Sequence, residues 1–355
     1  SSNPTSSNPT SSNPTSSSSS SSNPTSSSNP PSSPSPSLHL FKPIHALSQE
    51  KIVSVAGGGS HVLALSKSGE LWAWGSNEFG QLGLGDTTDH QQPQKSPFVR
   101  KLFKNCAIRQ IAAGGFHSLA LTDSGQVWSW GKGAEGVLGM GEDDNHNKAF
   151  PRPVGGSLSR QSVVAIACGY RHTLCLTDIG RIYGFGCNTT GQLGLPESVQ
   201  HQMSPRLIRS LDRHFVKYID CGFSHSVALT DTRLYSWGMG SQGQLGHGSN
   251  KPASFRPRRV RLPERSARAR VVEVKCGGFH NAILMESGNL YTWGSNKFGQ
   301  LGIGDTKNRN EPCFVSTLSN IHIKRISCGF WQTVIVGSTN IHPVVVDDKQ
   351  QKKVE

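Results

Sequence analysis

The chain has 355 residues, a formal net charge of +13 and a hydrophobic fraction of 34%. Residues 1–38 are uncharged and rich in Ser, Asn, Pro and Thr, with Leu38 as their one apolar side chain, so residues 1–40 are predicted to be disordered. The longest apolar runs, such as residues 344–346, are too short to span a bilayer, and the first residues show no secretory signal pattern.

From residue 41 onward the chain is built of repeats. A similar nine-residue phrase starts at residues 57, 113, 168, 221, 276 and 328, at intervals of 56, 55, 53, 55 and 52 residues. In the first five units an aromatic-glycine pair follows it. A Gly-x-Leu-Gly loop comes next, at residues 80–83, 136–139, 191–194, 243–246 and 299–302. Self-similarity at a fixed period of this kind indicates a repeat architecture.

Each unit contains short apolar runs separated by Gly and Asp. In the fourth unit these runs are residues 205–211, 216–221, 225–230 and 233–237. Their length and their content of Val, Ile, Leu and aromatic residues predict strands rather than helices. Four short strands in each unit predict an all-β fold, a propeller of four-stranded antiparallel blades over residues 41–346. A linear β-solenoid is the structural alternative, although its repeats are usually much shorter. Residues 347–355 are predicted to be a charged tail.

The repeats also resemble those of a known family. The repeats combine Cys/Ala-Gly-x-x-His, an aromatic-glycine pair and, in four of the first five units, a Gly-Gln-Leu-Gly loop, as in residues 77–86 (NEFGQLGLGD) and 296–305 (NKFGQLGIGD). These motifs resemble the regulator-of-chromosome-condensation (RCC-type) repeat, over roughly residues 41–346. The resemblance implies a β-propeller that serves as a rigid interaction platform.

The number of units departs from the seven that are usual in that family. Counting from residue 41 gives five complete units, and a sixth that runs from residue 312 through 336. The fourth strand of this sixth unit is expected to come from a segment such as residues 341–346. A closed six-bladed ring and a seven-bladed ring that lacks one unit both fit the sequence.

Two kinds of residue recur at equivalent places in the units. We interpret each histidine as making one repeated hydrogen bond within or between blades, because equivalent positions lie a blade apart, too far for a shared metal ion. The tryptophans of the aromatic-glycine pairs are predicted to be buried. These structural positions are His61, His117, His172, His225, His280, Trp74, Trp130, Trp237 and Trp293.

Four of the eight cysteines also recur at one position, at residues 168, 221, 276 and 328. Small residues stand near this place in the first two units, which indicates a small buried side chain rather than a disulfide framework. A reduced, intracellular protein of the cytoplasm or nucleus is therefore expected.

No catalytic signature is present: the sequence has no G-x-S-x-G elbow, no H-E-x-x-H pair and no P-loop. The glycines of the Gly-x-Leu-Gly loops are interpreted as turn residues, since no Lys-Ser/Thr follows them. We predict no catalytic residues, no metal site and no cofactor.

The connection between the fourth and fifth units is strongly basic, with seven arginines and one acid in residues 256–270. One interpretation is a solvated loop; the other is a contact for phosphates or carboxylates, which guanidinium groups bind through a fork of donors. A second group, Arg206, Arg209, Arg213 and Lys217, is expected to extend this surface. The predicted basic patch consists of Arg256, Arg258, Arg259, Arg261, Arg265, Arg268 and Arg270.

The resemblance implies two further activities, because the founding member of the family is a nucleotide exchange factor for a Ran-type small GTPase and docks on nucleosomes. Exchange there uses a protruding β-wedge, for which the acidic loop of residues 131–150 is the nearest candidate. The candidate wedge residues are Glu135, Gly136, Val137, Glu142, Asp143 and Asp144.

These features and the resemblance are compatible with three functions. The first is a monomeric propeller that binds a protein partner through loops on one face. The second is a guanine-nucleotide exchange factor for a small GTPase. The third is a protein that binds chromatin, DNA or anionic phospholipid through the basic patch.

Overall fold

The structure is a computed structural model that describes residues 43–103, 106–142, 144–262 and 270–339. The described residues from 44 to 339 fall within one compact unit. The predictions for residues 1–40, 341–346 and 347–355 lie outside the described residues. Within the described residues, no helix has the length and apolar character needed to cross a membrane.

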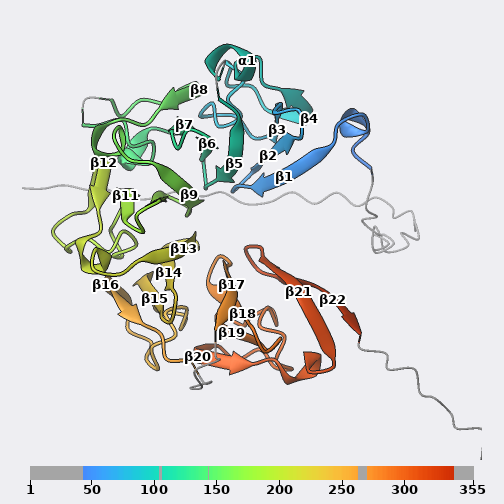
Figure 1. Cartoon of the computed structure of the whole chain (residues 1–355), viewed down its shortest axis with the longest axis vertical. Helices are drawn as coiled ribbons and strands as arrows, with labels where there is room; N and C mark the ends of the chain where they lie inside the picture. The colour runs from blue at the N-terminus through green and yellow to red at the C-terminus, as the bar shows by residue number, and fades with distance from the viewer. Residues whose placement is uncertain (1–42, 104–105, 143, 263–269, 340–355) are drawn as a thin grey trace, which may run out of the picture. The chain divides into compact units, whose positions relative to one another are not determined.

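The unit is a β-propeller built of antiparallel sheets that follow one another in chain order. Figure 1 shows that the first strand of each sheet lies nearest the centre of the array. Five described sheets have four strands and the sixth has two. The strands are β1 (Ile52–Gly57), β2 (His61–Ser66), β3 (Leu71–Gly75) and β4 (His90–Lys95); β5 (Ile108–Ala113), β6 (His117–Thr122), β7 (Val127–Gly131) and β8 (Lys148–Pro153); β9 (Val163–Cys168), β10 (His172–Thr177), β11 (Ile182–Cys187) and β12 (His201–Leu207); β13 (Val216–Cys221), β14 (His225–Thr230), β15 (Leu234–Met239) and β16 (Ala253–Arg259); β17 (Val271–Cys276), β18 (His280–Met285), β19 (Leu290–Gly294) and β20 (Arg309–Phe314); and β21 (Ile321–Cys328) and β22 (Thr333–Thr339).

Short helical turns occupy several connections between strands. They are the 3₁₀ turns η1 (His45–Leu47), η2 (Ala134–Gly136), η3 (Gly156–Leu158), η4 (Arg209–Leu211) and η5 (Ser316–Leu318), and the single-turn helix α1 (Val99–Leu102). All-β architecture and four-stranded blades were both predicted, and both are confirmed.

The assignment of two strands to units was wrong. Residues 205–211 were expected to open the fourth unit, but β12 is the outermost strand of the third sheet and the chain then turns through η4. In the same way Pro312 lies in β20, the outermost strand of the fifth sheet, not at the start of the sixth. The repeat phrase lies at the junction of the first two strands of a sheet. The strand that comes before these two in the sequence belongs to the preceding sheet and pairs with the third strand of that sheet.

The core lies between successive sheets. Ile111 on β5 is 5% exposed and packs with Leu63 and Leu65 on β2 of the preceding sheet. Ile326 on β21 is 3% exposed and packs with Ala282 and Leu284 on β18. Because neighbouring sheets cover both faces of β6, β10, β14 and β18, these second strands are buried and apolar along most of their length.

The two ends of the array lack such cover. Val55 on β1 pairs with Ala64 as Ile111 pairs with Ala120, yet Val55 is 63% exposed. Val334 and Val336 on β22 are 53% and 58% exposed. The described residues therefore form an open array with two uncovered sheet faces, rather than a closed six-bladed ring.

Candidate functional site

The histidines at the starts of the second strands join each sheet to the next. The ring Nε2 of His61 lies 2.9 Å from Ser118 Oγ, and that of His172 lies 2.9 Å from Ser226 Oγ. The same contact recurs between the other successive sheets. Its members are His117 with Thr173 at 3.0 Å, His225 with Asn281 Oδ1 at 2.9 Å, and His280 with Thr333 at 2.9 Å.

The geometry fixes the tautomer of these rings. The Ser226 hydroxyl donates its single proton to the carbonyl oxygen of Gln192 at 2.7 Å, so His172 Nε2–H must be the donor to Ser226 Oγ. The other ring nitrogen, Nδ1 of His172, is buried and has no hydrogen-bond partner. A second proton on this ring would be buried without an acceptor, and burial lowers the pKa of His172 to about 3.

Glycine precedes each of these rings for a steric reason. A Cβ added to Gly169 would lie 2.0 Å from Cε1 of His172 and 2.8 Å from the carbonyl oxygen of Gly222 in the next sheet. Similar distances hold in the other units. The Gly of the Cys/Ala-Gly-x-x-His motif therefore makes room for both the imidazole and the neighbouring backbone.

The tryptophans make a second link, from each sheet back to the one before it. Trp130 Nε1 donates to the carbonyl oxygen of Gln81 at 2.9 Å, and Trp237 and Trp293 make the same contact to Gln192 and Gln244. These three indoles are fully buried. Trp74 differs from the expectation and is only half-buried, because no described sheet precedes the first one.

The eight cysteines are all free thiols. Cys221 and Cys276 are buried at the ends of inner strands, and burial raises the pKa of each thiol well above its ordinary value. Asp220 lies between these strands and accepts from the backbone N–H groups of Cys221 and Cys276, each at 2.9 Å. Cys221 and Cys276 therefore pack between neighbouring inner strands as buried thiols.

An aromatic band covers the turns between first and second strands, which we call the inner turns. Phe116, Tyr170, Phe223 and Phe279 have successive ring centroids 5.4, 4.4 and 5.2 Å apart, so the contacts run from the second sheet to the fifth. The band consists of Phe79, Phe116, Tyr170, Phe223, Phe279, Phe298, Phe330 and Trp331. It surrounds a central opening of about 170 Å³ lined by the glycines of all six inner turns.

The band is most exposed near the end of the described array. Phe298 is 68% exposed, Trp331 42% and Phe330 41%. Trp331 contacts both of the others, with centroid distances of 5.1 Å to Phe298 and 4.7 Å to Phe330. At the other end Lys132 Nζ lies 4.8 Å from the ring centroid of Phe79 and 5.3 Å from that of Phe116.

Sequence analysis missed this band, although a signal was present. Each unit from the second to the sixth has an aromatic residue at one of the two positions before the histidine, or before Gln332 in the sixth. These positions were read only as the variable part of the motif. Phe79 and Phe298 join the band from the Gly-Gln-Leu-Gly loops, which lie on the same face as the inner turns.

The predicted basic patch lies mainly on the outermost strand of the fourth sheet: Arg256, Arg258 and Arg259 are on β16, and Arg261 follows it. Arg270 immediately precedes β17 and Phe279 follows it, so Arg270 and the aromatic band lie at opposite ends of this inner strand. Arg265 and Arg268 lie outside the described residues. The side chains of Arg256, Arg258, Arg259, Arg261 and Arg270 are all exposed. Among the residues the structure describes, no carboxylate pairs with any of these five guanidinium groups.

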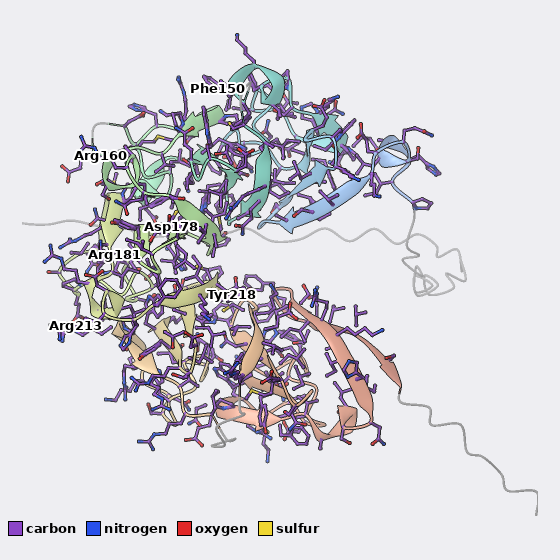
Figure 2. All side chains as sticks on the ribbon, in the orientation of Figure 1. Phe150, Arg160, Asp178, Arg181, Arg213 and Tyr218 are labelled. Carbon is purple, nitrogen blue, oxygen red and sulfur yellow. The ribbon has the colours of Figure 1, made fainter. Side chains whose placement is uncertain are left out.

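The second basic group lies beside this patch. The turn η4, which carries Arg209, contacts β16, which carries Arg256. Figure 2 shows Arg213 on the outer side of the array, whereas Tyr218 on β13 lies toward the centre. Lys217 forms an ion pair with Asp231, so its charge is partly balanced.

The candidate wedge loop has little regular secondary structure. Its described part contains η2 and no strand between β7 and β8, and Asp143 lies outside the described residues. Gly136 and Val137 are buried within the loop, and Glu142 is exposed. Asp144 forms an ion pair with Lys148, and the hydrogen bond from Lys148 lowers the pKa of Asp144. The ring Nδ1 of His146 lies 3.8 Å from the same carboxylate.

The fold and this face define a repeat propeller whose turns present an aromatic surface. The chain belongs to the RCC1-like domain family, whose model matches residues 25–342. Over 278 residues it is 38% identical to the ultraviolet-B receptor UVR8 of Arabidopsis thaliana, covering 78% of this chain and 60% of that protein. The chain thus spans less than two thirds of this relative's length.

Two solved structures have a similar fold. Human WBSCR16 aligns with a TM-score of 0.72 and 27% identity, over 81% of this chain and 72% of the other. Yeast RCC1 (Prp20), in its complex with Kap60, aligns with a TM-score of 0.71 and 28% identity, over 80% of this chain and 67% of the other.

Proposed function

We propose that this chain is a protein-interaction module that binds a protein partner through the aromatic band, in the cytoplasm or nucleus. The observation that carries the proposal is the exposure of Phe298, Phe330 and Trp331 as one contiguous cluster on the face of the inner turns. Large aromatic side chains supply much of the binding energy at protein interfaces because they bury a large area with few rotatable bonds.

The backbone beneath the band is suited to this role. The inner turns are fixed by the repeated histidine contacts, and glycines bring adjacent turns together, as where Gly115 N donates to Tyr170 O at 2.9 Å. A surface held in this way loses little conformational entropy when it binds. Lys132 and the neighbouring Arg171, which pairs with Glu135, place charged groups at the rim of the band.

The test compares capture of partners by the full chain and by variants. The double variant Phe298→Ala/Trp331→Ala should lose the captured partner, whereas Phe215→Ala should retain it. Phe215 is a suitable control because it is 55% exposed and lies in the connection before β13, at the other ends of the inner strands. Equal capture by the wild type and the double variant, both folded, would rule out the band as the binding surface.

A second candidate function is binding of a phosphate-bearing surface, either nucleosomal DNA or anionic phospholipid, by the basic patch. The five exposed arginines without a described carboxylate partner favour it, because unpaired guanidinium groups are free to contact phosphates. Replacing Arg258, Arg259 and Arg261 by Ala should weaken binding to nucleosomes or to anionic vesicles and flatten its salt dependence. Unchanged affinity and salt slope would count against the patch.

Nucleotide exchange is a third candidate, on the strength of the likeness to yeast RCC1. Release of fluorescent GDP from a panel of small GTPases, with this chain at micromolar concentration, measures it directly. Acceleration with one GTPase would support exchange, and none across the panel would remove it.

A further inference from the structure

We propose that Glu135, Cys187 and His201 bind a divalent zinc-type metal ion at the junction between the second and third sheets. One carboxylate oxygen, one sulfur and one imidazole nitrogen from these residues all lie within 4.8 Å of one another. The three residues are widely separated in the sequence and do not form a recognisable metal-ligand motif. Among the described residues no other group of three such side chains comes together in this way.

The sheet itself places two of the three ligands. Cys187 is the last residue of β11 and His201 is the first residue of β12, and the two are paired in the antiparallel register. Side chains of directly paired residues lie on the same face of a sheet, with Cβ atoms roughly 4.5–5.5 Å apart. Cys187 is fully buried, whereas His201 is exposed and gives the site access to solvent.

The third ligand comes from the preceding sheet. Glu135 lies in η2, and its φ of 62° is the one positive value at a non-glycine residue in the described part of the chain. The next residue, Gly136, has a φ of 74°, and a Cβ there would lie 2.6 Å from the carbonyl oxygen of Gln202 and from Cα of Met203. These two left-handed residues seat η2 directly on β12 and direct Glu135 toward the Cys187–His201 pair.

An unsatisfied atom at this place points to a ligand. Glu135 Oε1 accepts from Arg171, but Oε2 is buried and has no hydrogen-bond partner. A buried carboxylate oxygen left without a partner is costly, and a metal ion would satisfy it. Arg171 would then hold the carboxylate from outside, as groups around metal ligands commonly do.

The donor set suits zinc. Zinc takes thiolate, imidazole and carboxylate ligands at about 2.0–2.3 Å, and three protein ligands leave a fourth position for water. A thiolate disfavours Mg²⁺ and Ca²⁺, which prefer oxygen ligands. On binding, the Cys187 thiol would release its proton to solvent, and Thr189 Oγ1, which lies 3.3 Å from the sulfur, could donate to the thiolate.

Such an ion would join η2 to the third sheet beside the aromatic band. Glu135 and Arg171 line a small cavity together with Phe116 and Tyr170 of the band. We infer that the ion would hold this part of the binding face in place.

The experiment titrates the full chain, freed of metal by a chelator, with Zn²⁺ in a calorimeter. We expect one site that Cys187→Ser and His201→Ala each weaken by about tenfold or more. Cys313→Ser is the matched control, because this half-buried thiol lies on β20, outside the site. Zinc should also raise the thermal unfolding temperature of the wild type and of the control, but not that of the two site variants.

Cobalt substitution gives a spectroscopic test, because sulfur-to-cobalt absorption reports direct coordination by a thiolate and does not arise from a change in folding alone. With Co²⁺ the wild type and Cys313→Ser should show sulfur-to-cobalt charge-transfer absorption, and Cys187→Ser should not. His201 is exposed, so His201→Ala tests the site without disturbing the core. Absence of stoichiometric zinc binding to the wild type, or equal binding by the wild type and His201→Ala, would overturn the proposal.

Discussion

His172 Nε2 and Ser226 Oγ lie 2.9 Å apart across the boundary between the third and fourth sheets. The ring that donates this bond is neutral, because a second proton on its buried Nδ1 would have no acceptor. Four other boundaries carry an equivalent bond, so one chemical requirement is repeated along the array.

The first prediction is a loss of stability in acid. Burial lowers the pKa of His172 and His117 to about 3 and that of His61, His225 and His280 to about 4, from an ordinary value of 6.5. Between these values the unfolded chain binds more protons than the folded chain, so stability is complete above pH 6.5 and falls as the pH drops toward 4. Asp220 acts in the opposite sense, since burial raises its pKa.

Chemical denaturation at a series of pH values measures this slope. His225→Gln should lessen it, because Gln can keep a hydrogen bond to Asn281 and does not titrate; Gln332 stands at the equivalent position of the sixth sheet. A variant as sensitive to acid as the wild type would show that these histidines do not control the response.

The second prediction concerns two adjacent glycines. Gly58→Ala should cost about 1–3 kcal/mol, because its Cβ would lie 2.3 Å from Cε1 of His61 and 2.6 Å from the carbonyl oxygen of Gly114. Gly57→Ala should change stability by less than about 0.5 kcal/mol, since nothing lies within 4 Å of the added carbon. Equal effects in thermal unfolding would contradict the steric account.

The third prediction uses the two environments of tryptophan. Trp293→Ala should cost about 3–5 kcal/mol, because Trp293 is fully buried and donates to Gln244 at 3.0 Å. Trp74→Ala should cost clearly less, since Trp74 is half-buried. Urea unfolding of both variants gives the comparison, and wild-type stability of Trp293→Ala would mean that β19 is misplaced.

The fourth prediction tests the uncovered end of the array. Ile111→Ala should cost about 2–5 kcal/mol through the loss of packing against β2. Val55→Ala, at the equivalent position of the first sheet, should stay within about 0.5 kcal/mol, because Val55 is 63% exposed. A large loss in the valine variant would show that its face is covered in solution.

Sequence analysis predicted the repeated strands and histidines and missed a cluster of side chains that occurs once. The histidine motif predicted inner strands, because a period of one sheet appears directly in the chain. Glu135, Cys187 and His201 share no motif, and they meet only because β11 pairs with β12 and η2 packs on them. Contacts of this kind depend on register and on the packing of one sheet on another, which no local pattern encodes.

The strand grouping shows the same limit on a smaller scale. Residues 205–211 have the composition of a strand wherever they pair, and only the sheet order shows that β12 closes the third sheet. The aromatic band was missed for another reason, since its members alternate between two positions before the histidine and so do not form a constant letter of the motif.

The histidines of the first four units each bond to the residue that directly follows the histidine of the next unit. This pattern has an evolutionary consequence. Loss of one unit, for example residues 117–171, would place Thr173 where Ser118 now meets His61. The new neighbours would already carry a donor and an acceptor that fit each other. Arrays of this kind can therefore gain or lose whole units by unequal recombination, because the two units brought together already carry matching hydrogen-bonding groups.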